Sequence, residues 1–541
     1  MRGLMMEYQL NLTAILKRAE TLFGNKEIVT RKADKSLHRY TYKDFASRSK
    51  KLALALERLG MGSGDRVATL CWNHHRHLEA YFGIPCAGAV LHTLNLRLHP
   101  DDLAYIIGHA EDRALLVDES LLPLFEKVRD RADLDHVIVL SETNHVPEGF
   151  LDYEELLEGE DESGFEYPDL DERSAAAMCY TSGTTGKPKG VVYSHRAIAL
   201  HSLGHLVADA LAIGESDVVL PVVPMFHANA WGLPFSCVLA GAKQVFPGPR
   251  LDPESLLELF EGEKVTATAG VPTIWLGLLQ TLDKEPDKYD LSNLRAMLVG
   301  GSAPPEAMIR GFEERHGLSI LQGWGMTETT PLGTLATLTS ELKSASKDEQ
   351  YRYRAKQGIP MPFIEVRTRG DEGFAPWDGE TMGEVEIRGP WVARSYYESP
   401  DSEEKFSEDG WLKTGDIATI DRRGYLEIKD RTKDLIKSGG EWISSVALEN
   451  ALMAHESVAE AAVIAIPDDK WQERPLAAIV FKEGQSATPE ELESHLAPDF
   501  AKFWLPDRYE VAEEIPKTSV GKFKKMELRE RFAEARFARG E

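Results

Sequence analysis

The sequence has few cysteines, no long apolar run and no excess of basic residues, and each shortage excludes a class of protein. The four cysteines are far apart and form no C-x-x-C pair, so neither a disulfide framework nor a zinc site is indicated. No segment approaches the roughly 18 consecutive apolar residues of a membrane span, and the N-terminus lacks the apolar core of a signal peptide. Asp plus Glu number 88 against 62 Lys plus Arg, which argues against a nucleic-acid-binding surface. We therefore expect a cytoplasmic protein, either free or peripherally associated with a membrane, with its cysteines buried as small apolar side chains.

What is present is an α/β pattern in a chain of 541 residues, which is too long for one hydrophobic core. Up to about residue 430, apolar runs of strand length alternate with helical patterns. We predict strands at 67–70, 175–180, 218–223, 296–299 and 385–387. A helix is predicted at 195–211, with Leu200, Leu203, Val207 and Leu211 on one face.

A second, compact unit is predicted after residue 430. A helix carries Val446, Leu448 and Leu452, and apolar strands follow at 461–466 and 476–481. The next helix begins after Thr488, where Thr-Pro-Glu-Glu forms a capping box with proline at the first helical position. These elements predict a separate domain of about a hundred residues.

A loop of small, hydroxylated and basic residues follows the strand predicted at 175–180. It reads Thr181-Ser182-Gly183-Thr184-Thr185-Gly186-Lys187-Pro188-Lys189-Gly190. Small side chains let backbone N–H groups approach an anion, while the hydroxyls and lysines add donors and positive charge. The loop is not a Walker A sequence, because its glycines are too close together and Lys187 precedes a proline. These residues favour polyphosphate binding over a turn-rich surface loop.

As a string, this loop resembles the signature loop of the adenylate-forming superfamily, which includes acyl-CoA synthetases, peptide-synthetase adenylation domains and beetle luciferases. Further matches follow in the family's order, at 300–304, 322–329, 411–416, 430–443 and 516–522. The resemblance covers nearly the whole chain. It implies an α/β fold with a large multi-sheet N-terminal domain at 1–430, a hinge at 431–436 and a small mobile α+β C-terminal domain at 437–541.

The resemblance also implies a site for ATP and AMP built from several of these motifs. The expected nucleotide-binding residues are Thr181, Ser182, Gly183, Thr184, Thr185, Gly186, Lys187, Ala228, Gly301, Ser302, Ala303, Pro304, Gln322, Gly323, Trp324, Gly325, Thr327, Asp416, Arg431, Lys433, Lys437 and Trp442. Within this set Asp416 is expected to hold the ribose, with Arg431 as its companion. Thr181 and Glu328 are the expected ligands of Mg²⁺, which prefers hard oxygen ligands.

The resemblance assigns the remaining roles as follows. Lys522, His227, Thr181 and Glu328 are the expected catalytic residues, and Lys433 is the pivot of the hinge. Gly439 and Gly440 are expected to wall the CoA side of the site. Lys522 would place a positive charge where negative charge builds up in the reaction.

The segment at 224–234 is expected to contact the acid, through His227, Trp231 and the nearby Gly323. It is apolar and aromatic and contains no Asp or Arg, so an apolar acid fits better than an amino acid. The strings at 230–234, 437–445 and 471–475 are most similar to those of bacterial medium- and long-chain fatty acyl-CoA synthetases. In those enzymes the residue matching Trp231 gates the acyl tunnel.

The expected function is therefore an ATP-dependent fatty acid–CoA ligase, which forms acyl-CoA, AMP and pyrophosphate through an acyl-adenylate. ATP, Mg²⁺ and CoA are the implied cofactors and cosubstrates, the partners are small molecules and not nucleic acid, and the resembling enzymes are homodimers. Three alternatives stay open: an aryl or short-chain acyl-CoA ligase, an enzyme that loads a carrier-protein thiol, and a non-catalytic nucleotide sensor. The sequence leaves the acyl chain length undetermined.

Overall fold

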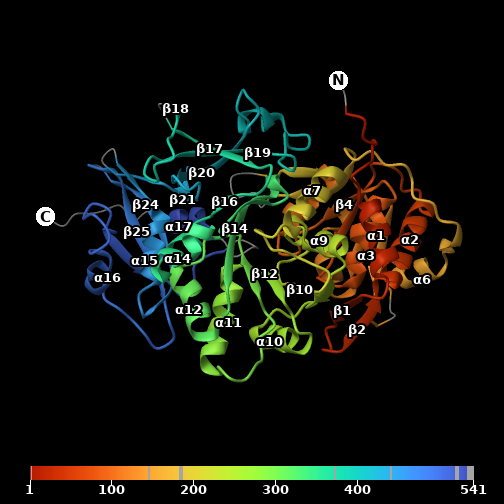
Figure 1. Ribbon diagram of the computed structural model, residues 1–541, viewed down its shortest axis with the longest axis horizontal. Coiled ribbons are helices and arrows are strands. Elements are labelled where there is room, and N and C mark those ends of the chain that lie inside the picture. Colours follow the sequence, from red (N-terminus) through yellow and green to blue (C-terminus); the bar gives the residue numbers. More distant parts are fainter. Residues whose placement is uncertain are drawn as a thin grey trace.

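The computed structural model describes residues 1, 3–143, 146–181, 187–370, 373–438, 441–468, 470–517 and 523–532 (Figure 1). Within these ranges the chain forms four β-sheets. Two large sheets and the helices around them make up the N-terminal part, and two smaller sheets follow in the second half of the chain. In the described part of the chain, no helix is both long and apolar enough to span a bilayer.

The seven-stranded sheet has the strand order β7-β6-β5-β3-β4-β8-β9. Its strands are β3 (Arg66–Leu70), β4 (Val90–Thr93), β5 (Asp112–Asp118), β6 (His136–Leu140), β7 (Leu151–Asp152), β8 (Ala175–Tyr180) and β9 (Gly190–Ser194). All neighbours are parallel except β8 and β9, which form an antiparallel pair. The loop of small and basic residues joins β8 to β9 at one end of this sheet.

The nine-stranded sheet has the strand order β16-β15-β14-β13-β12-β10-β11-β1-β2. Its strands are β1 (Glu27–Arg31), β2 (Leu37–Thr41), β10 (Val218–Pro221), β11 (Lys243–Phe246), β12 (Ala267–Gly270), β13 (Ala296–Val299), β14 (Ile320–Gly325), β15 (Leu332–Leu335) and β16 (Ile359–Pro360). The strands from β14 to β1 are parallel, and their carboxyl ends share one edge. In open α/β sheets this edge is the usual place for a ligand.

Helices cover both large sheets. Those of the N-terminal part are α1 (Leu12–Phe23), α2 (Tyr42–Arg58), α3 (His75–Cys86), α4 (Pro100–Ala110), α5 (Leu122–Phe125), α6 (Tyr153–Glu158), α7 (His195–Leu206), α8 (Ala228–Trp231), α9 (Leu233–Ala240), α10 (Pro253–Gly262), α11 (Pro272–Lys284), α12 (Glu306–His316), α13 (Ser340–Lys343) and α14 (Lys347–Arg354). One apolar core joins α1, α3, α7 and α9 to strands of both sheets, so these helices lie between the sheets. A second core packs α10, α11 and α12 on the outer face of the nine-stranded sheet.

A five-stranded antiparallel sheet follows, with the order β18-β17-β19-β20-β21. Its strands are β17 (Glu365–Gly370), β18 (Gly373–Phe374), β19 (Gly383–Arg388), β20 (Leu412–Ile420) and β21 (Leu426–Arg431).

The last sheet contains β22 (Ile436–Ser438), β23 (Glu441–Ile443), β24 (Val458–Asp468), β25 (Gln472–Phe481) and β26 (Arg508–Val511), with α15 (Ser445–Met453), α16 (Pro489–Leu496) and α17 (Lys525–Arg531). It has apolar cores of its own. The chain passes from one sheet to the other between Arg431 and Ile436, and in Figure 1 the last unit lies at the end of the molecule opposite the N-terminal helices.

Most predicted elements are present, but two end earlier than predicted and one helical face is wrong. The strands at 175–180 and 296–299 match β8 and β13 in both bounds, and the four cysteines are buried and free, as expected. The helix predicted at 195–211 ends at Leu206, because Val207 has an extended backbone. Its predicted apolar face is also wrong, since Leu203 and Val207 are exposed, whereas the helix buries histidines. The strand predicted at 218–223 ends at Pro221.

Candidate active site

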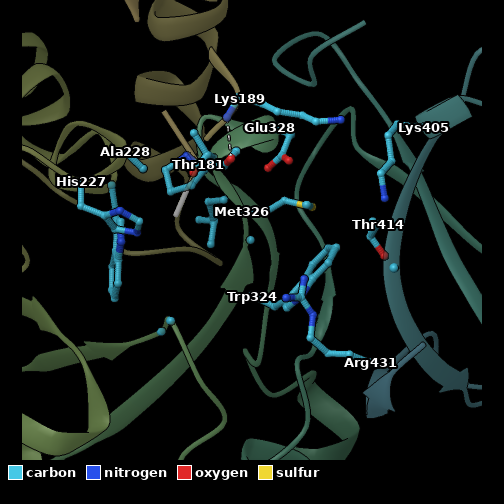
Figure 2. Close-up of a pocket in the computed structure, with 18 of the residues that line it drawn as sticks. Thr181, Lys189, His227, Ala228, Trp324, Met326, Glu328, Lys405, Thr414 and Arg431 are labelled. Atoms are coloured by element: carbon cyan, nitrogen blue, oxygen red, sulfur yellow. Dashed lines mark hydrogen bonds between the residues drawn. The ribbon is translucent and has the colours of Figure 1, made fainter. Parts of the chain in front are cut away.

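A cavity of about 710 Å³ lies where β8, β14, β20 and β21 approach one another. Thr181 follows β8, Trp324 lies near the end of β14, and Arg431 ends β21. Figure 2 shows Thr181 and Glu328 close together on one side and Trp324 beside Arg431 on another, with Met326 between the two groups. Residues distant in sequence therefore share one enclosed space.

Two residues that line this cavity, Trp324 and Arg431, hold the carboxylate of Asp416. Trp324 Nε1–H donates to Asp416 Oδ2 at 3.0 Å, and Arg431 Nε–H donates to Asp416 Oδ1 at 3.0 Å. The antiparallel register places Asp416 directly opposite Arg431 on β20 and β21. The Asp416 carboxylate raises the pKa of the Arg431 guanidinium further above its usual value. A buried carboxylate fixed in this way can still accept hydrogen bonds from the two hydroxyls of a ribose.

Glu328 is the acidic side chain at the middle of the cavity. Tyr396 donates its hydroxyl proton to Glu328 Oε1 at 2.5 Å, and both side chains are buried. Burial, together with the charge of Glu328, raises the pKa of Tyr396, so Tyr396 stays a donor at neutral pH. The Lys189 ammonium lies 5.1 Å from the centre of the Tyr396 ring. Thr181 Oγ1 accepts a hydrogen bond from the Lys189 backbone N–H at 3.1 Å.

This part of the cavity suits an anion and a hard divalent cation. Lys187, Lys189 and Lys405 line it and provide positive charge toward phosphate oxygens. The Glu328 carboxylate and the Thr181 hydroxyl are oxygen ligands of the kind that Mg²⁺ prefers. The donor set therefore fits the predicted metal.

The opposite end of the cavity is built on a left-handed turn. Residues 228–231 have φ between 42° and 55°, and Gly232 has φ 78°. Such a conformation costs roughly 1–2 kcal/mol for each non-glycine residue, and backbone strain of this kind is common at functional sites. Buried contacts hold the turn, among them a hydrogen bond from Cys179 Sγ to Asn229 Oδ1 at 3.3 Å. The turn brings the Trp231 indole against Gly300, where a Cβ atom would lie 3.0 Å from the ring.

Apolar groups line this end. His227, Trp231 and Gly323 all line the cavity there, together with Leu298 and Leu332. Their contact with an acyl group stays a prediction. Because Gly300 and Gly323 have no side chains, the space between these groups stays open; a Cβ at Gly323 would lie 3.1–3.4 Å from three leucine side chains. The cavity thus joins a polar, positively charged region to an apolar one.

A second cavity of about 560 Å³ lies between the N-terminal part and the C-terminal unit. Ser302, Ala303 and Gln322 line one side of it. Residues of α15 and of the stretch around Lys517 and Phe523 line the other side. Lys522 itself lies outside the described residues, and Lys517 and Phe523, on either side of its segment, line this cavity.

The structure gathers most of the predicted site residues around these two cavities. Those lining the first are Thr181, Lys187, His227, Ala228, Trp231, Gly301, Gly323, Trp324, Gly325, Thr327, Glu328, Arg431 and Lys433. Ser302, Ala303, Gln322 and Asp416 line the second. Ser182 to Gly186, Gly439, Gly440 and Lys522 lie outside the described residues.

Three predicted residues line neither cavity. Pro304 is buried beside them. Lys437 and Trp442 lie on the C-terminal unit, where the Lys437 ammonium is 4.5 Å from the centre of the exposed Trp442 ring. Neither residue lines a cavity in this arrangement, and their expected contact with the adenylate stays a prediction.

Sequence reasoning did not select Tyr396, Lys405, Thr414 or His205 as site residues, although all four line the first cavity. Lys405 lies in an ordinary charged stretch, and Tyr396 is one of two adjacent tyrosines, so neither carries a local signal. His205 was assigned to a helix whose apolar face was misplaced. The sequence offered one signal, the three histidines at positions 195, 201 and 205 of the predicted helix.

Comparisons with known proteins agree with this geometry. The family model described as AMP-binding enzyme matches residues 16–397, and that of the AMP-binding enzyme C-terminal domain matches residues 447–522. A long-chain-fatty-acid–CoA ligase of Thermus thermophilus is 54% identical over 98% of this chain and 96% of its own. A medium-chain-fatty-acid–CoA ligase of Ectopseudomonas oleovorans is 41% identical, over 99% of this chain and 98% of its own.

Solved structures show the same architecture. An anthranilate CoA ligase in complex with anthranoyl-AMP superposes with a TM-score of 0.85 at 27% identity, covering 97% of this chain and 98% of that one. ATP-bound MatB from Rhodopseudomonas palustris gives a TM-score of 0.83 at 26% identity, covering 98% and 100%. With its two family models, full-length relatives and shared fold, the chain belongs to the AMP-binding enzyme family, the adenylate-forming enzymes.

Proposed function

We propose that this protein is an ATP-dependent fatty acid–CoA ligase, which converts a fatty acid, ATP and CoA into acyl-CoA, AMP and pyrophosphate. One observation carries the proposal. One cavity joins a lysine- and glutamate-lined centre to an apolar end beside His227 and Trp231. Its lining residues Trp324 and Arg431 both hydrogen-bond to Asp416, a carboxylate suited to a ribose that lines the adjoining second cavity. ATP and an apolar carboxylic acid, placed along these adjoining cavities, would meet at the α-phosphate.

In the first half-reaction the acid's carboxylate oxygen attacks the α-phosphorus, and the bond to the leaving pyrophosphate breaks. His227 would position the carboxylate, while Lys187 and Lys189 would hold phosphate oxygens. Glu328 and Thr181 would hold Mg²⁺, which when bound neutralises phosphate charge. Lys522 is proposed to stabilise the charge that develops between the carboxylate and the α-phosphate. Positioning and electrostatic stabilisation dominate transfers of this kind.

In the second half-reaction the CoA thiol sulfur attacks the acyl carbonyl, and AMP leaves. We propose that the C-terminal unit first rotates about Lys433 and withdraws Lys522. Lys517 and Phe523 face the second cavity here, whereas Lys437 and Trp442 lie away from both cavities. This supports assigning the present arrangement to adenylation. Gly439 and Gly440 are proposed to wall the CoA channel after rotation.

The acid is tested by measuring AMP release with CoA across straight-chain acids of increasing length and a set of benzoate-type acids. The apolar end of the cavity and the names of the relatives support long or medium alkanoates, so these should give the highest kcat/KM. If benzoate-type or two- to four-carbon acids outrun every longer alkanoate, the fatty-acid assignment is wrong. Trp231→Ala should change the order among chain lengths more than it changes the KM for ATP.

The thiol acceptor needs a separate test, because no described feature distinguishes CoA from the phosphopantetheine of a carrier protein. We propose free CoA, in agreement with the relatives' names. Thioester formation on a holo-carrier protein in the absence of CoA, at a rate above that with CoA, would favour carrier loading. A protein that binds ATP but forms no adenylate with any acid would be a nucleotide sensor.

We also propose that the chain acts as a homodimer in the cytoplasm. Leu4, Met5, Met6 and Tyr8 are exposed near the N-terminus, and apolar side chains of this kind favour burial against a second copy. Light scattering on the purified protein tests the assembly, and a mass corresponding to one chain at micromolar concentration would contradict it. Fractionation of cells tests the location, including peripheral membrane association.

A further inference from the structure

His205 stands out at the apolar end of the cavity, because it lines the cavity and one of its nitrogens has no partner. It lies in the last turn of α7 and is fully buried. Among the residues that the structure describes, no group hydrogen-bonds to His205 Nε2. Leaving a buried polar atom unpaired costs about 1–3 kcal/mol. Because His205 lines the cavity, a group of a bound ligand is a candidate partner for this buried nitrogen.

The hydrogen bonds of His205 define which role Nε2 can play. His205 Nδ1 lies 2.8 Å from Ser236 Oγ, and Ser236 Oγ donates its proton to the Gly232 carbonyl oxygen at 3.0 Å. A hydroxyl has one proton, so Ser236 cannot also donate to His205. His205 Nδ1 therefore carries the hydrogen, and Nε2 presents a lone pair. Burial lowers the pKa of His205 to about 4, which keeps the ring neutral at physiological pH.

The neighbouring His201 does not share this property, because its Nε2 already has a hydrogen-bond donor. His201 Nε2 already accepts a hydrogen bond from the Leu332 backbone N–H at 3.2 Å. The two rings meet edge to face, with centroids 4.5 Å apart. Gly232 keeps this pair in place, because a Cβ there would lie 2.6 Å from the His201 ring. The geometry thus fixes His205 beside the turn that carries Trp231.

The surroundings of His205 select the chemistry of its partner. The charged side chains that line the cavity come from three places: the loop at 181–190, the turn at 326–329, and the third sheet with its connections. They are Lys187, Lys189, Glu328, Lys405, Lys413, Arg431 and Lys433. The histidine end offers apolar walls instead. A lone pair there repels carboxylate, keto and ether oxygens and accepts from a neutral donor.

We propose that His205 Nε2 accepts a hydrogen bond from a hydroxyl group on the acyl chain, so that this protein activates hydroxy-fatty acids in addition to the parent alkanoates. This inference rests on the proposed function, since it adds a specificity-determining residue to the same acyl site. His205 touches no reacting atom in this scheme, and Ser236 acts as a positioning residue through the proton on Nδ1.

The test compares hydroxy acids with the parent alkanoate of equal length, with the hydroxyl moved along the chain. For each enzyme the readout is the ratio of kcat/KM for the hydroxy acid to kcat/KM for the parent, measured by AMP release. His205→Leu should lower this ratio about tenfold at the best hydroxyl position, the size expected for one hydrogen bond to a buried acceptor. Because each ratio is taken within one enzyme, a general loss of activity does not mimic the effect.

Two further variants sharpen the result. His195→Leu is the matched control, since His195 lies on the same helix, is buried and also has an unpartnered Nε2, but does not line the cavity. Its ratio should equal that of the unmodified protein. Ser236→Ala lets the proton move to Nε2, which can then donate, so it should raise the corresponding ratio for oxo acids, whose keto oxygen can only accept.

The outcomes separate this inference from the proposed function. If the unmodified protein releases no AMP with any parent alkanoate, the proposed function fails. If alkanoates are substrates but His205→Leu leaves the ratio unchanged at every hydroxyl position, only the hydroxyl site is overturned, and water is the partner of Nε2. A fall in the ratio that appears equally in His195→Leu would likewise overturn it.

Discussion

Tyr396 donates a hydrogen bond of 2.5 Å to Glu328, although 68 residues separate them in the sequence. The pair fixes one oxygen of the carboxylate that is proposed to hold Mg²⁺. It also explains why an acidic side chain can stay buried between lysine-bearing segments. Buried carboxylates need such partners, because an unpaired buried charge is costly.

Tyr396→Phe should therefore impair adenylate formation. The change removes one hydrogen bond to a charged group, and kcat/KM for MgATP should fall about tenfold. The Mg²⁺ concentration needed for half-maximal rate should rise as well. Tyr397→Phe is the matched control, because the adjacent tyrosine does not line the cavity. Equal losses in both variants would show that the Glu328 contact is irrelevant to catalysis.

Asp416→Asn should weaken ATP binding. The amide keeps one acceptor oxygen but loses the charge that pairs with Arg431 at 3.0 Å. The KM for ATP should rise about tenfold, with a smaller change in the KM for the acid. Asp421→Asn serves as the control, since Asp421 pairs with Lys356 outside both cavities. If the two substrates' KM values rise together, Asp416 does not act through the nucleotide.

A buried contact across residues 431–436 offers a test of the proposed rotation. Asp430, at the end of the third sheet, accepts hydrogen bonds from the Ser445 backbone N–H at 2.6 Å and from its hydroxyl at 2.5 Å. Lys525 Nζ donates to the same hydroxyl at 2.6 Å. Because Asp430 and Ser445 lie on opposite sides of residues 431–436, a rotation there would have to break this contact.

Ser445→Ala should therefore loosen the present arrangement. A hydrogen bond to a charged group contributes about 1.5–3 kcal/mol, so its loss should lower the rate of adenylate formation several-fold. The rate of thioester formation from supplied acyl-adenylate should stay the same or rise. Ser494→Ala, an exposed serine on α16, is the control. A parallel loss in both half-reactions would mean that the contact supports folding alone.

Lys433→Pro should affect the opposite half-reaction. Proline holds φ near about -65° and would stop this residue from changing its backbone angles. Thioester formation from supplied acyl-adenylate should fall far more than adenylation. Lys433→Ala is the matched comparison, because it removes the same side chain but keeps the backbone freedom. It should lose far less thioester formation than Lys433→Pro, and a loss common to both variants reports the side chain's own contact in the cavity. Loss of adenylation alone in Lys433→Pro would rule out the pivot.

The sequence predicted the strands of this protein better than the residues that line its cavity. Buried parallel strands appear as continuous apolar runs, which is why 175–180 and 296–299 matched β8 and β13. The motifs located Asp416, Glu328 and Trp231 because each lies in a distinctive string. Tyr396 and Lys405 could not be predicted, since only the packing of the third sheet against β14 brings them to the cavity. His205 was missed because a polar residue inside a helix normally faces solvent.

The central claim is that the protein activates its acid as an adenylate before any thiol takes part. It is tested most directly by exchange of labelled pyrophosphate into ATP, with fatty acid present and CoA absent. We predict exchange that depends on the fatty acid and that falls by about a hundredfold in Lys522→Ala, the loss expected when one charge-stabilising group is removed. Exchange that requires CoA, or release of ADP in place of AMP, would contradict the account.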